Sequence, residues 1–187
     1  MGTLSYTATI SLDGYVADTS GDFQWAAPSE EIFQFHVDRM AAVSSEVLGR
    51  NTYQLMGYWQ TEPEDGSWGE SEREFARRWR NIDHVVASST LLQEDLASEP
   101  VRLIADLGLS ALEQIVENAR GEVEIFGPTT ASESIRAGLV TDFRFFVVPK
   151  IVGGGLSALP DGARLDLRLL EQRLFDNGTA YLHYESR

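Results

Sequence analysis

The stretch "EVLGRNTY", Glu46 to Tyr53, passes from an apolar segment directly into polar residues that can begin a helix. Its apolar residues suit a buried strand, Gly49 permits a tight turn, and Asn51 or Thr52 can cap a helix. A helix start offers free N–H donors to an anion, and the Arg50 guanidinium matches phosphate oxygens. The stretch therefore predicts an α/β protein with a phosphate-binding junction, for which an ordinary capped turn is the alternative.

Strand and helix patterns alternate along the rest of the chain. Strands are expected at 4–11, 46–49, 83–89, 101–105, 123–127 and 142–151. Helices are expected at 29–40, 72–79, 109–119 and 129–139. Two alternating runs around Asp176-Asn177-Gly178 predict a C-terminal antiparallel hairpin. The fold class is therefore α/β, with a mixed, mainly parallel central sheet flanked by helices, in a single domain 1–187.

Composition excludes several classes of function. The 187 residues carry a formal charge of -14, which disfavours nucleic acid and anionic membrane surfaces as partners. There is no cysteine, and the three histidines are far apart in sequence, so no metal site is expected. The first residues lack a basic, apolar leader pattern, and we expect a cytoplasmic protein.

Two further strand ends carry groups that suit an anion. Ser88 and Ser89 place two hydroxyls after a buried strand, although a serine pair there also fits a simple turn. "EIFGPTTASESI" places Gly127 and Pro128 at a strand end, with Thr129 or Thr130 at the next helix start. An ordinary capped helix is again the alternative.

The order of these pieces resembles the dihydrofolate reductase-like superfamily. The resemblance rests on "SLDGYVAD…GDFQW", "VLGRNTYQLM", "VVASSTL", "EIFGPTTASESIRAGLVTDFRFFVVPKIVGGG" and the closing hairpin, and it covers nearly the whole chain. It is nearer to the branch that contains the C-terminal reductase domain of bifunctional riboflavin-biosynthesis proteins. The resemblance implies a dihydrofolate reductase-like fold and NADPH as cofactor.

The resemblance also implies roles for the junction residues. It assigns Arg50 to the 2′-phosphate of NADPH, together with the serine pair, and the helix start at Thr52 to the pyrophosphate. The later turn, in which Pro128 replaces a glycine that is usual in the family, would also cradle the pyrophosphate. The full set of expected cofactor-binding residues is Gly49, Arg50, Asn51, Thr52, Ser88, Ser89, Gly127, Pro128, Thr129 and Thr130.

Two carboxylates are the candidate catalytic residues. Counting from Trp25 and Pro28, Glu30 matches the position at which the resemblance implies an acid facing the substrate, and Glu31 is its neighbour. The alternative is that both acids only complement the helix dipole. Asp13 is expected to orient the loop over the nicotinamide, although an Asp-Gly turn explains it equally well.

The expected function is an NADPH-dependent reductase that transfers hydride to a small planar heterocycle, of pterin or aminopyrimidine type, or to a carbonyl compound. The alternatives are a non-catalytic NADP(H)-binding module and a stand-alone ribosylaminopyrimidine-phosphate reductase of riboflavin biosynthesis. The resemblance to the riboflavin-type branch also implies a homodimer. The sequence offers a reason, because the apolar strand at 142–151, which we expect near the sheet edge, needs covering.

Overall fold

The computed structural model describes residues 2–96 and 101–187, which form two compact units. One unit comprises Gly2 and Glu30–Glu124, and the other comprises Thr3–Ser29 and Ile125–Arg187. Strand β6, Glu122–Phe126, crosses the boundary and contributes residues to both units. The expectation of a single domain 1–187 therefore stays a prediction.

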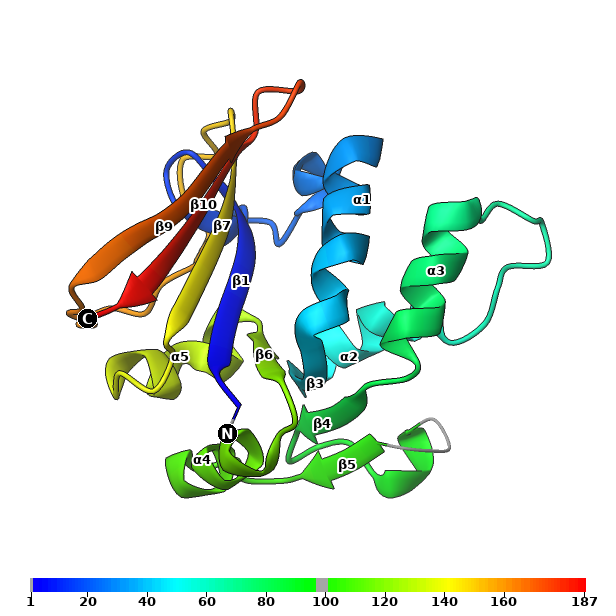
Figure 1. The fold of residues 1–187 in the computed structure, drawn as a ribbon, viewed down its shortest axis with the longest axis vertical. Coiled ribbons are helices and arrows are strands. Elements are labelled where there is room, and N and C mark those ends of the chain that lie inside the picture. The colour runs from blue at the N-terminus through cyan, green and yellow to red at the C-terminus, as the bar shows by residue number, and fades with distance from the viewer. Residues whose placement is uncertain (1, 97–100) are drawn as a thin grey trace. The chain divides into compact units, whose positions relative to one another are not determined.

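The central unit, Glu30–Glu124, alternates helices and strands as the sequence predicts (Figure 1). Its elements are α1 Glu30–Arg39, η2 Met40–Ala42, β3 Val43–Gly49, α2 Arg50–Met56, η3 Gly57–Trp59, α3 Glu70–Trp79, β4 Asp83–Ala87, η4 Gln93–Asp95, β5 Val101–Ile104 and α4 Leu109–Asn118.

The strands of this unit run parallel in the order β5-β4-β3, and β6 follows β3. Register pairs Gly49 with Ala87, so β3 and β4 end side by side and the residues that follow them meet at one edge. Val47 and Leu48 of β3 and Val85 and Val86 of β4 are buried, whereas β5, at the edge of the sheet, is only partly buried. The fully buried Leu48, Val86 and Trp79 mark the core of this unit.

The second unit holds the N-terminal and C-terminal segments. Its elements are β1 Leu4–Ser11, β2 Tyr15–Ala17, η1 Gln24–Ala26, α5 Pro128–Arg136, β7 Asp142–Val148, β8 Leu156–Ser157, β9 Leu167–Leu174 and β10 Ala180–Ser186. Here β1 pairs with β7 in parallel, and β10 pairs antiparallel with both β7 and β9. The predicted C-terminal hairpin is therefore confirmed, and so is the mixed, mainly parallel fold class.

Strand β7 corrects one expectation. The apolar run at 142–151 was expected near a sheet edge, but β7 lies between β1 and β10 (Figure 1). Its Phe143 and Phe146 are buried, and Phe143 makes an edge-on contact with Tyr6 of β1. The apolar sequence reflects burial on both faces of the sheet, and the edge strand of this unit is β9 instead.

The glycine triplet after β7 forms a close backbone crossing. Gly153, Gly154 and Gly155 all have positive φ angles. A Cβ added to Gly155 would lie 2.0 Å from the carbonyl oxygen of Ala17. The triplet therefore forms a tight turn, and the strand that follows it, β8, pairs with β2. Within the described ranges, no helix is long and apolar enough to cross a membrane.

Candidate functional site

The ends of β3 and β4 form a candidate anion-binding junction in the central unit. Arg50 begins α2 directly after β3, and Ser88 directly follows β4. The Nη1 atom of Arg50 donates a hydrogen bond of 3.1 Å to the Thr90 hydroxyl, and Thr90 Oγ1 lies 3.3 Å from Ser88 Oγ. The structure thus brings together a guanidinium and two hydroxyls from separate segments.

Ser88 also holds the turn in which it lies. Its hydroxyl oxygen accepts hydrogen bonds from the backbone N–H groups of Thr90, at 3.2 Å, and Leu91, at 3.1 Å. Ser88 is buried whereas Ser89 and Thr90 are exposed, so the turn presents polar groups to solvent beside Arg50. The turn interpretation of the serine pair is therefore confirmed, and an anion-binding role is compatible with it.

Helix α2 begins differently from the expectation. Its N-cap is Gly49, and no side chain caps it, so neither Asn51 nor Thr52 is the cap. Both lie inside the first turn, because Gly49 keeps an extended backbone and Arg50 already has helical geometry. The Asn51 side chain instead accepts a hydrogen bond of 3.4 Å from Nε of Arg50. This contact helps to hold the guanidinium over the helix start.

The junction between β6 and α5 lies in the second unit. Gly127 is the N-cap of α5 with φ 86° and ψ 132°, a conformation that only glycine adopts readily. Pro128 occupies the first helical position, where its missing N–H costs no intrahelical bond. Thr129 and Thr130 follow in the first turn, and no side chain caps the helix. The free N–H groups of this turn suit an anion.

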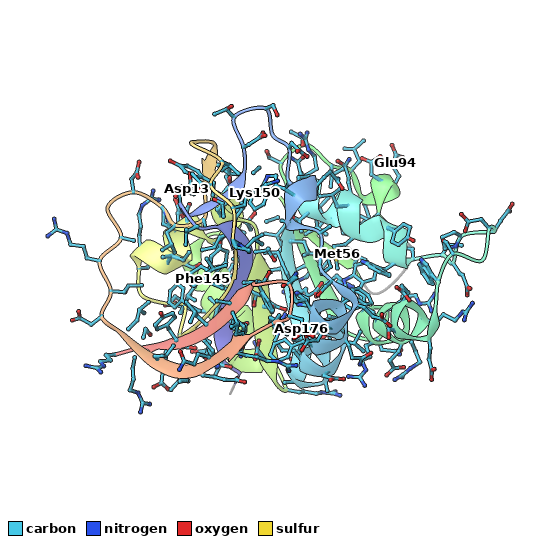
Figure 2. All side chains as sticks on the ribbon, turned by 90° about the horizontal axis from the view of Figure 1, so that it is seen from above. Asp13, Met56, Glu94, Phe145, Lys150 and Asp176 are labelled. Atoms are coloured by element: carbon cyan, nitrogen blue, oxygen red, sulfur yellow. The ribbon has the colours of Figure 1, made fainter. Side chains whose placement is uncertain are left out.

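Asp13 ties two loops of the second unit together. Its carboxylate accepts hydrogen bonds from the backbone N–H groups of Val152, at 3.1 Å, and Gly153, at 2.8 Å. Figure 2 shows Asp13 beside Lys150, whose carbonyl accepts a bond of 2.7 Å from Leu12 N–H. A hydrogen bond from Ser11, followed by those from the two loop amides, lowers the pKa of Asp13 below its usual value. Asp13 is therefore an ionised loop anchor.

Glu30 and Glu31 open α1 in the other unit. Glu30 is exposed, whereas Glu31 is half-buried. Phe33, one turn further on, stacks on Trp59 with ring centroids 5.7 Å apart and also packs on Phe75. This aromatic packing fixes the start of α1 against α3, and it leaves the Glu30 carboxylate accessible to a ligand.

Glu46 on β3 is a buried acid that was not predicted from the sequence. Glu46 is 1% exposed, and its Oε2 atom accepts a hydrogen bond of 2.7 Å from Nε1 of Trp79. His84, its register partner on β4, places Nε2 at 3.7 Å from the same oxygen. Burial, reinforced by the charge of Glu124, raises the pKa of Glu46 to about 8. The only sequence signal was an acid inside an otherwise apolar strand.

The second carboxylate of this buried cluster is neutralised by an arginine. Glu124 on β6 is 0% exposed, and its Oε1 atom lies 2.7 Å from Nη2 of Arg39. Arg39 also approaches Glu122, at 3.6 Å. Arg39 is thus committed to these acids and is not available as a phosphate ligand.

The family is decided by a match along almost the whole chain. The model of the RibD C-terminal domain matches residues 3–181. The chain belongs to the RibD C-terminal domain family. This confirms the resemblance to the dihydrofolate reductase-like superfamily and to its riboflavin-biosynthesis branch. No curated protein matches the sequence significantly.

Solved structures agree with the fold of this RibD C-terminal domain. A protein from Shewanella sp. PV-4, named for a provisional role in riboflavin biosynthesis, is 20% identical with a TM-score of 0.75, covering 99% of each chain. Dihydrofolate reductase from Enterococcus faecalis, solved with NADP(H) and RAB-propyl, is 14% identical with a TM-score of 0.66, covering 100% of this chain and 97% of its own.

A third relative is bifunctional. Diaminohydroxyphosphoribosylaminopyrimidine deaminase/5-amino-6-(5-phosphoribosylamino)uracil reductase from Thermotoga maritima is 16% identical with a TM-score of 0.66. The match covers 100% of this chain and 57% of the Thermotoga protein. Membership of the RibD C-terminal domain family supports a reductase, and hence an oxidoreductase, as the general activity.

Proposed function

We propose that this protein is an NADPH-dependent reductase that acts on a small planar heterocycle, of pterin or aminopyrimidine type, or on a carbonyl compound. The observation that carries the proposal is the meeting of Arg50, Thr90 and Ser88 at the adjacent ends of β3 and β4. A guanidinium beside hydroxyls suits a phosphate monoester, and an acid at this position would be expected for a cofactor without the 2′-phosphate.

The donors present fit NADPH by their chemistry. Arg50 has five N–H donors, of which the described contacts use two, and it is exposed beside Thr90. These donors would hold the 2′-phosphate. In the central unit, the first turn of α2, with Gly49 as N-cap, offers backbone N–H groups for the pyrophosphate. In the second unit, the first turn of α5, with Gly127 as N-cap, offers donors of the same kind. The bound cofactor would supply the hydride.

The remaining chemical requirement is a proton for the reduced substrate. In this proposal the Glu30 carboxyl, exposed at the start of α1, hydrogen-bonds the heterocycle and directs the proton. Asp13 has a positioning role, because its ionised carboxylate is already occupied by the amides of Val152 and Gly153.

Two alternatives keep the cofactor site but differ in chemistry. A non-catalytic module would bind NADPH and reduce nothing. A ribosylaminopyrimidine-phosphate reductase would need cations for the substrate phosphate, and the name of the Thermotoga relative supports this candidate. Arg39 is held by Glu124, which leaves Arg50 and Lys150 from the candidates that the sequence offered. A neutral substrate therefore remains preferred.

Titration with NADPH and NADH, followed through tryptophan fluorescence, tests cofactor binding, and we expect tighter binding of NADPH. Equal affinity for the two nucleotides, or none, would reject the proposal. NADPH oxidation is then measured with a dihydropterin, an aminopyrimidine with and without a ribose phosphate, and an aldehyde. Binding without oxidation of NADPH by any of them favours the non-catalytic module.

We also propose that the protein is a homodimer. Strand β9 is the edge of the second unit, and it exposes Leu169, Leu170 and Leu174, the last at 75%. An apolar edge strand is usually packed against another segment or chain, because its unpaired backbone groups and exposed apolar side chains otherwise promote aggregation. A second copy of the chain supplies that cover in this proposal.

A further inference from the structure

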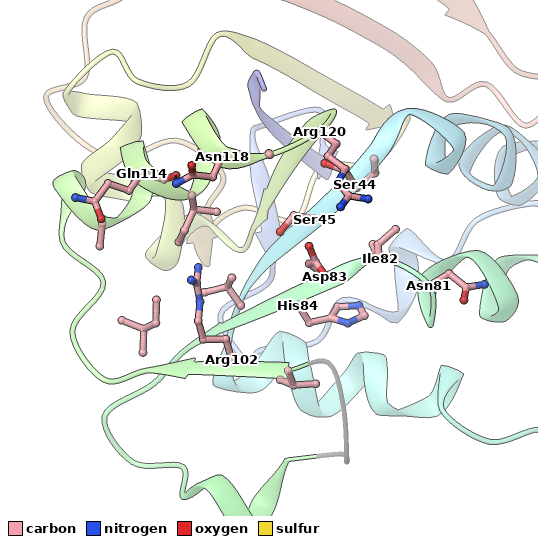
Figure 3. A pocket seen from close by; sticks show the side chains of 17 residues that line it. Ser44, Ser45, Asn81, Ile82, Asp83, His84, Arg102, Gln114, Asn118 and Arg120 are labelled. Carbon is pink, nitrogen blue, oxygen red and sulfur yellow. Dashed lines mark hydrogen bonds between the residues drawn. The ribbon is translucent and has the colours of Figure 1, made fainter. Parts of the chain in front are cut away.

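A cavity of about 1000 Å³ lies within the central unit, between α4 and the face of β4 and β5 (Figure 3). Its strand wall comes from the first residues of β3 and β4 and from Val101, Arg102 and Ile104 of β5. Neither Arg50, Ser88 nor Thr90 lines the cavity, although the carbonyl of Ile104 accepts a hydrogen bond from Ser88 N–H. The cavity is therefore distinct from the proposed cofactor site. Its size is that of a small-molecule site.

Two arginines from separate segments line the cavity. Arg102 extends from β5 toward α4, and Arg120 comes from the turn between α4 and β6 (Figure 3). Neither side chain makes a hydrogen bond or ion pair with any other residue that the structure describes. In a chain with a formal charge of -14, two cations without acidic partners in one cavity provide a local site for an anion.

The cavity also contains a hydroxyl that no other side chain engages. Ser45 is 5% exposed and lines the cavity, and its Oγ makes no hydrogen bond to the rest of the described chain. This hydroxyl can donate a hydrogen bond to a ligand acceptor in the cavity. Figure 3 shows the Asp83 carboxylate in the same part of the cavity, where it disfavours a second negative group nearby.

The rest of the wall includes both polar and apolar side chains. Val85 on β4 and Ile115 on α4 contribute to it, together with Ile104 on β5. Register pairs Val85 with Arg102, so an apolar side chain and a cation lie next to each other on one face of the sheet. This arrangement suits a ligand with an anionic group and an apolar body.

We propose that this cavity is a second small-molecule site, for an organic anion that carries one phosphate or carboxylate group on an apolar body. Arg102 and Arg120 bind the anionic group, the Ser45 hydroxyl donates to it, and the apolar body rests on Val85 and Ile115. The site does not depend on the proposed reductase activity.

Calorimetric titration of the whole protein with phenyl phosphate tests this site. We expect a dissociation constant of about 0.1–1 mM, which is ordinary for a ligand of this size. Arg102→Gln and Arg120→Gln should each weaken binding about tenfold, the change expected when a charge-assisted hydrogen bond is lost. Both arginines are exposed, so these variants should fold, and circular dichroism checks that they do.

The matched control is Arg164→Gln, at another exposed arginine, which should not change the affinity for phenyl phosphate. Arg50→Ala, at the proposed cofactor junction, tests whether phenyl phosphate binds at that junction instead. Loss of binding in Arg50→Ala alone would place the phosphate at that junction and overturn the second site. Unchanged binding in both cavity variants would overturn it too, as would the absence of binding. Benzoate should also bind, and equal affinity for benzyl alcohol would contradict an anion site.

Discussion

The indole nitrogen of Trp79 on α3 donates a hydrogen bond of 2.7 Å to the buried carboxyl of Glu46 on β3. Both side chains are essentially inaccessible to solvent, and Glu124 lies close enough for its charge to disfavour ionisation of Glu46. The Glu46 carboxyl is therefore protonated at neutral pH, in the interior of the central unit.

The free energy of unfolding of the protein should fall as the pH rises toward 8. The folded-state pKa of Glu46 is raised from 4.5 to about 8, so the folded state holds a proton that the unfolded state releases. Each unit of pKa difference between the folded and unfolded states corresponds to about 1.4 kcal/mol of unfolding free energy. The free energy of unfolding should therefore fall by on the order of a few kcal/mol between the unfolded and the folded pKa of Glu46. Burial lowers the pKa of His84 to about 4, and this histidine has the opposite effect below its unfolded pKa of 6.5.

Urea unfolding between pH 7.5 and 8.5 isolates the Glu46 contribution, since both the folded and the unfolded pKa of His84 lie at least one unit below this range. Glu46→Gln should flatten the pH dependence, because an amide accepts the Trp79 bond without a titrating proton. Glu94→Gln, at an exposed acid, is the control and should leave the wild-type slope. A wild-type slope in Glu46→Gln would contradict the buried proton.

Arg50→Ala should weaken NADPH binding by about 1.5–3 kcal/mol, the range for hydrogen bonds to a charged group. NADH affinity should change little, because NADH lacks the 2′-phosphate. Fluorescence titration measures both constants. Arg80→Ala, at an exposed arginine bonded to a backbone carbonyl, serves as control and should retain the NADPH preference. An equal loss for both nucleotides would argue against recognition of the 2′-phosphate.

Gly155→Ala should destabilise the protein by at least about 2 kcal/mol, because the new Cβ meets the Ala17 carbonyl and φ is +135°. Gly57→Ala is the matched comparison, since Gly57 has φ −53° and open space around its Cα. That change should be neutral or add up to about 1 kcal/mol. The denaturant midpoints of the two variants give both stability changes. Equal midpoints would mean that the backbone at Gly155 can move away from Ala17 to admit a Cβ.

Glu30→Gln should lower turnover of an identified substrate while NADPH affinity stays nearly constant. The amide keeps the size of the side chain but cannot supply or accept the proton. Glu31→Gln, one position on and half-buried, is the control and should reduce substrate at close to the wild-type rate. Wild-type rates for Glu30→Gln across the pH range would remove Glu30 from the mechanism.

Leu174→Lys should shift the protein from dimer to monomer, because it places a charge on the exposed edge strand β9. Sedimentation velocity distinguishes the dimer from the 20.8 kDa monomer. Leu12→Lys alters another exposed leucine and should leave the dimer intact. A monomeric wild-type protein at micromolar concentration would refute the proposed assembly.

The sequence predicted the strands and helices well because their patterns are local. The alternation of Leu4–Ser11 and the Asn177-Gly178 turn each specify an element without reference to the rest of the chain. The sheet position of β7 was missed, since an apolar strand reads the same whether it lies at an edge or in the centre.

The site was predicted in part for the same reason. Arg50 and Ser88 follow strand ends that could be found in the sequence, and parallel pairing brings them together. Thr90 was missed because its contact with Arg50 depends on how the turn after β4 folds back. The cap of α2 was misassigned, because Gly49 leaves the strand with an extended backbone and needs no side-chain oxygen to begin the helix.

The insertion of the central unit between two parts of the second one has a consequence for synthesis on the ribosome. Strand β1 is made first, yet its neighbours in the sheet, β6 and β7, begin at Glu122 and Asp142. At about 5–20 residues per second, the nascent chain carries β1 without a neighbouring strand for roughly 5–25 s. The contiguous segment from Glu30 is complete before β7 emerges, so vectorial folding starts in the middle of the polypeptide.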